Sequence, residues 1–108
     1  MSWDVHLEAD LGGGEPVRVG DLAANYTYNV SPMFSAVIGT GLNELDGIRA
    51  SEMAEKCVAI LDAFNRDPAK FKAMNPSNGW GDFEGARKFI QTILNACREA
   101  PNATLRVG

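Results

Sequence analysis

Histidine and cysteine are scarce in this chain, and their scarcity excludes most metal sites. The 108 residues include one His and two Cys. The histidine, His6, lies between Asp4 and Glu8 in an alternating pattern that a solvated strand face explains better than a metal site. Because no second His is present to complete a zinc site of the usual type, we expect neither a metal nor a cofactor.

Long apolar runs are also absent, and the two cysteines are placed as core residues. No stretch reaches the roughly 18 apolar residues of a membrane span, and the first residues lack the basic and apolar blocks of a signal peptide. Cys57 and Cys97 occupy apolar positions of helical patterns, as buried free thiols of a reducing compartment would. These features predict a cytoplasmic protein without a membrane partner.

Positive charge is too sparse and too scattered for a nucleic-acid-binding surface. Ten Lys and Arg residues oppose fourteen Asp and Glu residues, and the formal net charge is −4. Non-specific nucleic-acid binding requires clustered Lys and Arg that neutralise phosphates, so we expect no nucleic acid as a partner. With 45% hydrophobic and 22% charged residues, the chain has the composition of one globular domain over residues 1–108.

The usual catalytic motifs are missing as well. Gly39-Thr40-Gly41 lacks the third glycine and the preceding strand of a dinucleotide-binding fingerprint, and there is no Gly-Lys-Ser/Thr phosphate loop. No serine lies in a nucleophile elbow. We therefore assign no catalytic residue, and an enzyme that works through carboxylates such as Asp46 or Asp82 is the third alternative for function.

Hydrophobic alternation at both ends of the chain predicts a small sheet. Trp3, Val5 and Leu7 alternate with polar residues, residues 11–14 supply a glycine-rich reversal, and the alternation restarts over 17–19. This pattern predicts an N-terminal hairpin. Residues 104–107 alternate again, and since two strands alone are marginally stable in water, we expect them to pair with the hairpin.

Helical periodicity fills the middle of the chain. A short helix is expected over about 32–38 with Ser31 as its N-cap, and a long helix is expected from Ser51. A short turn of helix follows Pro68, and a final long helix begins after an Asp82 cap. The two long helices have apolar stripes: Met53, Cys57, Ile60, Leu61 and Phe64, then Phe83, Ala86, Phe89, Ile90, Ile93, Leu94 and Cys97. The predicted fold is α+β: a small, mainly antiparallel sheet, formed by the N-terminal hairpin and the C-terminal strand, with helices packed on one face.

Two polar-aromatic runs, residues 25–29 and 75–82, are the most informative parts of the sequence. The first is expected to form a loop or an irregular extended segment. In the second, the glycines on both sides of Trp80 permit positive φ and close approach of the backbone to other groups. Trp80 offers a flat face and one N–H donor, and Asn side chains both donate and accept hydrogen bonds.

Each run has a structural and a functional interpretation. In the structural one, the Asn side chains bond to nearby backbone, the tyrosines cover the core edge, Trp80 seals the core and Asp82 caps a helix. In the functional one, both runs precede helices that pack on the same sheet, so they can form one binding site on loops held by a rigid scaffold. The candidate ligand-binding residues are Asn25, Tyr26, Tyr28, Asn29, Asn75, Asn78, Trp80 and Asp82.

The same segments carry a family resemblance. Residues 25–29, 31–33 and 45–47, and above all the Asn-Pro-x-Asn-Gly-Trp-Gly element of residues 75–81, resemble small uncharacterised proteins of actinobacteria and their bacteriophages. The resemblance extends from about Trp3 to Val107. It assigns no activity and no site residue. It implies a cytoplasmic accessory protein, with a phage gene as one possible origin, that acts on host components.

These observations favour a non-enzymatic accessory binding protein. In this hypothesis, Trp80 stacks on a small polar or planar ligand, such as a nucleotide or a sugar, while the asparagines bind its polar edge. The alternative is a module that binds a host protein, with Trp80 and the tyrosines as anchors. A ligand site predicts a concave pocket that joins the two runs, whereas a protein-binding site predicts a flatter apolar patch with an exposed Trp80.

Overall fold

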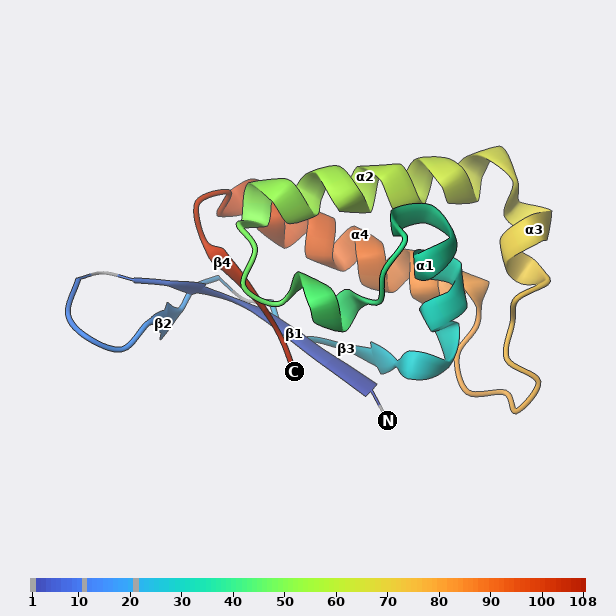
Figure 1. Cartoon of the computed structure of the whole chain (residues 1–108), viewed down its shortest axis with the longest axis horizontal. Helices are drawn as coiled ribbons and strands as arrows, with labels where there is room; N and C mark the ends of the chain where they lie inside the picture. The colour runs from blue at the N-terminus through green and yellow to red at the C-terminus, as the bar shows by residue number, and fades with distance from the viewer. Residues whose placement is uncertain (1, 11, 21) are drawn as a thin grey trace.

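The computed structural model describes residues 2–10, 12–20 and 22–108 of the chain. Four strands form one antiparallel sheet, and the helices lie together on one side of it (Figure 1). The α+β class and the one-sided packing are therefore as the sequence predicts. Leu11, where the expected hairpin reversal begins, lies outside the described residues.

Strand β1 (Ser2–Ala9) is the centre of the sheet, because each of the other strands pairs with it. The two-residue strand β2 (Val17–Arg18) completes the expected hairpin. Strand β4 (Thr104–Val107) pairs with β1 in the register that places Leu105 opposite Leu7. The C-terminal segment therefore joins the N-terminal hairpin as expected.

Strand β3 (Ala24–Thr27) corrects the expectation of a loop or irregular segment at residues 25–29. It pairs with the first half of β1, with Tyr26 opposite Trp3, and leads directly into the 3-10 helix η1 (Tyr28–Val30). Directly opposed residues of a sheet point to the same face, so Tyr26 shares the helix-covered face with the buried Trp3. Cross-strand pairing thus overrides the local turn preference of the asparagines.

The helices follow the expected order with small shifts at their starts. Helix α1 begins at Ser31, so Val30, rather than Ser31, is its N-cap, because η1 runs directly into it. Gly39, with φ of 80°, ends α1 as expected. The remaining helical elements are η2 (Leu42–Leu45), α2 (Ala50–Arg66), α3 (Pro68–Lys72) and α4 (Phe83–Glu99), with α1 spanning Ser31–Ile38.

The hydrophobic core lies between the sheet and the paired helices α2 and α4 (Figure 1). All seven residues of the stripe predicted for α4 are buried, as are four of the five predicted for α2, and Leu61 is half-buried beside them. The described part of the chain contains no buried polar residue. No helix within that part is long and apolar enough to cross a membrane.

Candidate functional site

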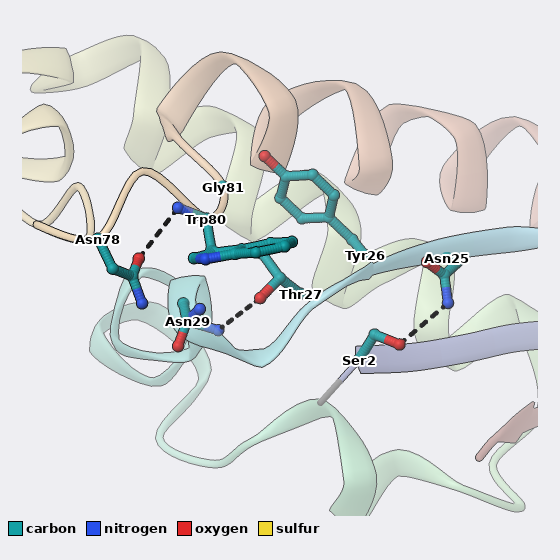
Figure 2. Close-up of a pocket in the computed structure, with 8 residues that line it drawn as sticks. All are labelled: Ser2, Asn25, Tyr26, Thr27, Asn29, Asn78, Trp80 and Gly81. Carbon is teal, nitrogen blue, oxygen red and sulfur yellow. Dashed lines mark hydrogen bonds between the residues drawn. The ribbon is translucent and has the colours of Figure 1, made fainter.

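The two polar-aromatic runs meet at one end of the molecule, where they line a surface pocket of about 630 Å³. The end of β3 and the start of η1 form one wall, and the loop between α3 and α4 forms the other (Figure 2). Five of the eight candidate residues line this pocket: Asn25, Tyr26, Asn29, Asn78 and Trp80. Its other described lining residues are Ser2, Thr27 and Gly81, which were not among the candidate ligand-binding residues.

Tyr26 joins the two walls. Its hydroxyl accepts a hydrogen bond from the backbone N–H of Asp82 at 3.0 Å and donates one to the Asp82 carbonyl at 3.3 Å. Its ring stacks on that of Phe89 in α4, with 5.6 Å between ring centroids. A Cβ at Gly85 would overlap the Tyr26 hydroxyl, so only glycine admits this contact in the first turn of α4. The sequence analysis did not single out Gly85, because its role depends on packing against a distant residue.

The glycines around Trp80 adopt the conformations that the sequence suggests. Gly79 and Gly81 have φ of 75° and 89°, in the left-handed region that L side chains avoid. A Cβ at Gly81 would also lie 2.5 Å from Cγ2 of Thr27, so the backbone passes very close to β3 here. Oδ1 of Asn78 accepts a hydrogen bond from the Trp80 backbone N–H at 3.0 Å. The turn that carries Trp80 is therefore constrained at several points.

The Trp80 side chain points outward and does not seal the core. It is 69% exposed, and its indole extends from the loop across the pocket, above Thr27 and toward Tyr26 (Figure 2). Within the described part of the chain, no hydrogen bond forms from its ring nitrogen. Both the flat face and the N–H donor of Trp80 are thus accessible to a ligand.

The asparagine side chains divide their polar atoms between the fold and the pocket. The Asn25 amide group donates to Ser2 Oγ, the Trp3 carbonyl and Asp4 Oδ1, at 3.2, 3.0 and 2.8 Å. Its carbonyl oxygen, the Asn78 amide group and both polar ends of the Asn29 side chain have no hydrogen-bond partner among the described residues. The pocket therefore offers both donors and acceptors.

The other three candidate residues support the structure beside the pocket rather than line it. The Tyr28 ring lies 4.9 Å from that of Trp3, and its hydroxyl accepts a hydrogen bond from Asn43 Nδ2. Asn75 Oδ1 accepts one from the Phe83 backbone N–H at 2.9 Å. Asp82 Oδ1 accepts one from the Gly85 N–H at 2.7 Å, which makes Asp82 the N-cap of α4. The geometry of these three residues therefore agrees with the structural interpretation of the two runs.

The pocket lining has no formal charge among the residues that the structure describes. All eight of its residues are uncharged at neutral pH. The carboxylates closest to it in the hydrogen-bond network belong to Asp4, through Asn25, and to Asp82, whose backbone binds Tyr26. Lys88 lines an adjoining hollow of about 390 Å³ between β3 and α4, which shares Asn25 and Tyr26 with the pocket. The local electrostatics therefore disfavour an anion in the pocket itself.

Outside the pocket, the cysteine thiols and the Asp46 carboxylate, which could act in catalysis, have structural roles. Burial raises the pKa of the Cys57 thiol to about 12 and that of Cys97 to about 11, so both stay protonated at neutral pH. Asp46 accepts a hydrogen bond from the Val107 N–H at 2.9 Å and pairs with Arg106 at 3.3 Å, which fastens β4. Over the described residues, no group of three or more His, Cys, Asp or Glu is placed to hold a metal ion.

Comparisons of the chain with protein-family models, curated proteins and solved structures gave no match. Function is therefore inferred from the geometry and chemistry of the pocket. Its features are an accessible indole face, amide groups with free donors and acceptors, and a constrained backbone beneath them.

Proposed function

We propose that this chain is a non-enzymatic binding protein that holds a small polar or planar ligand in the pocket between β3 and the loop before α4. One observation carries the proposal: the exposed Trp80 indole lies across a concave surface lined by amides and hydroxyls from two distant parts of the chain. Small-molecule sites have volumes of roughly 300–1,000 Å³ and few polar groups, and this pocket falls within that range.

The rigidity of the pocket supports the proposal. Binding a ligand on a mobile loop costs conformational entropy, and a preorganised site avoids much of that cost. Here Tyr26 fixes the loop to β3 through Asp82, and the close approach of Gly81 to Thr27 fixes the turn that carries Trp80. An exposed aromatic side chain on a constrained turn is more easily explained by binding than by stability.

A second candidate function is the binding of a partner protein, favoured by the exposure of Trp80 itself. Trp is enriched among the residues that dominate protein–protein binding energies, and a side chain that is 69% exposed can be buried by a partner. In this alternative, a polar segment of a host protein would occupy the pocket with Trp80 as its anchor. The concavity of the pocket places the small-ligand proposal first.

The biological setting is also a proposal. Two free, buried cysteines suit a reducing compartment such as the cytoplasm. The scattered basic residues and the uncharged pocket give no support to nucleic-acid binding. The resemblance of residues 75–81 supports an accessory role in an actinobacterium or in one of its phages.

The proposal is tested by screening a library of small polar and aromatic compounds against the ¹⁵N-labelled full chain by NMR. We expect hits to shift the Trp80 indole N–H and the side-chain amides of Asn29 and Asn78, and Trp80→Ala to abolish the shifts of the two asparagine amides. Val17→Ala is a matched control, since Val17 is the other exposed large hydrophobic residue in the described part, at 43%, and lies far from the pocket on β2. Hits that bind Trp80→Ala unchanged would refute the proposed site.

A further inference from the structure

The lining of the pocket restricts the chemical class of its ligand. A phosphate group is an anion that proteins bind with Lys, Arg, a metal ion or several backbone N–H groups. Among the residues that the structure describes, none that lines the pocket has a cationic side chain, and Asp4 lies one hydrogen bond away from the pocket through Asn25. Moving a phosphate into such surroundings removes its hydration without an opposing charge, so the lining disfavours phosphate-bearing ligands.

The polar groups lie on more than one side of the indole. In Figure 2, Asn29 and Asn78 lie toward one end of the Trp80 ring, and Ser2 and Asn25 lie beyond the other end. A nucleobase presents its hydrogen-bonding atoms along the edges of one flat ring system. A sugar ring has hydroxyl groups around most of its periphery, and each hydroxyl both donates and accepts. In the pocket, amide and hydroxyl groups lie around the Trp80 ring. This arrangement matches the hydroxyl groups around a sugar ring better than the edge of a nucleobase.

The aromatic platform suits a sugar as well. One face of a pyranose ring presents C–H groups, which are apolar and slightly positive, and the face of an indole is the negative part of its quadrupole. The exposed Trp80 ring can bury such a face while the ring edge of the sugar stays within reach of the asparagines. No charged partner is needed for either contact.

We infer that the pocket binds an uncharged saccharide, with Trp80 stacking on the sugar ring and Asn25, Asn29 and Asn78 bonding its hydroxyl groups. The inference rests on the proposed function and narrows its ligand class, since it selects sugars over nucleotides. The adjoining hollow between β3 and α4 shares two lining residues with the pocket, so it offers room for a second sugar unit. Lys88, which lines that hollow, is a cation that could recruit a phosphate there instead.

Titrations of the ¹⁵N-labelled full chain test the inference. The probes are the methyl glycosides of glucose, galactose, mannose and N-acetylglucosamine, with adenosine and AMP as competitors of the other class. We expect at least one glycoside to shift the Trp80 indole N–H and the Asn29 and Asn78 amides, and to bind at least about tenfold more tightly than AMP. Trp80→Ala should weaken that glycoside about thirtyfold, as the loss of a dominant contact residue does.

Matched variants separate the contributions of individual side chains to ligand binding. Asn78→Ala and Asn29→Ala should each weaken the glycoside, whereas Asn95→Ala, on the exposed face of α4, should not. Asn29→Lys adds the missing positive charge, so it should strengthen AMP binding while it weakens the glycoside. Lys88→Gln should leave the glycoside affinity unchanged within about twofold, because Lys88 does not line the pocket.

The possible results distinguish the inference from the function on which it rests. Adenosine or AMP binding at Trp80 more tightly than every glycoside would overturn the saccharide inference and leave the small-ligand proposal standing. AMP that binds more tightly than every glycoside, and that Lys88→Gln releases, would also overturn the saccharide inference and would place the ligand in the adjoining hollow rather than at Trp80. No shift with any of the six probes would overturn the saccharide inference. Failure of the wider compound screen as well would refute the small-ligand proposal.

Discussion

Trp3 and Trp80 have the same side chain in opposite environments. Trp3 is 1% exposed, and its ring lies against those of Tyr28, Phe34 and Phe89. Its ring nitrogen donates a hydrogen bond to an Asn43 oxygen at 2.6 Å. Trp80 is 69% exposed, and within the described part of the chain its ring nitrogen has no partner. The ring of Trp3 is buried and its N–H is bonded, whereas the ring and the N–H of Trp80 are accessible to solvent.

The difference shows that the two tryptophans have different roles. Trp3 lies on the central strand, where alternation directs it toward the helices, and burial of an indole requires a partner for its N–H. Trp80 lies on a turn between two glycines of positive φ, which hold its backbone but leave its side chain outside. Burial of the Trp3 ring stabilises the fold. The turn around Trp80, in contrast, holds a side chain that contributes little to stability. Three substitutions test this contrast.

Trp3→Ala should have the largest effect. Removal of a buried aromatic side chain leaves a cavity and costs about 3–5 kcal/mol, and it also leaves Asn43 without its hydrogen-bond donor. Urea denaturation followed by far-UV circular dichroism measures the change in unfolding free energy. A loss below about 1 kcal/mol would mean that the core tolerates the missing ring, and the contrast with Trp80 would fail.

Gly81→Ala should have an intermediate effect, and Gly79→Ala is its control. Both glycines have positive φ, so alanine at either site costs about 1–2 kcal/mol in backbone strain. A Cβ at Gly81 also meets Thr27 and Val30, whereas one at Gly79 meets nothing within 4 Å. Gly81→Ala should therefore lower the unfolding free energy by about 1–3 kcal/mol more than Gly79→Ala, as overpacking does. Equal losses in denaturation would show that the contact with β3 has no energetic weight.

Trp80→Ala should have the smallest effect on stability. A side chain that is 69% exposed contributes within about 0.5 kcal/mol, so the midpoint of urea denaturation should hardly change. The same variant should nevertheless lose ligand binding. If it instead unfolds the chain by 3 kcal/mol or more, as removal of a core aromatic would, Trp80 belongs to the core and leaves the candidate site.

The sequence was most informative where one periodic pattern decides the structure. The stripe in α4 and the alternation of Trp3, Val5 and Leu7 each name a buried face, because burial repeats with the period of the element. The pairing of the C-terminal strand followed from the need of a hairpin for a further strand. The glycines beside Trp80 likewise indicated a backbone with positive φ, which both of them adopt.

The sequence was least informative where contacts join distant segments. The asparagine-rich run at 25–29 favoured a loop locally, but pairing of residues 24–27 with β1 made most of it a strand. Helix α1 begins at Ser31, one residue before the expected start, because η1 precedes it without a break. Gly85 gave no local signal, since its role depends on a tyrosine nearly sixty residues earlier in the chain.

By itself, the sequence determined the α+β class and the buried faces of the long helices, and it singled out the two polar-aromatic segments that line the pocket. Only the tertiary structure brought those segments together, placed Trp80 outside the core, and separated the pocket residues from Tyr28, Asn75 and Asp82, which support them. The physical reason is the separation along the chain over which each effect acts. Periodicity and turn chemistry act over a few residues. A pocket depends on hydrogen bonds and close packing between distant segments, such as Tyr26 and Asp82, which are 56 residues apart.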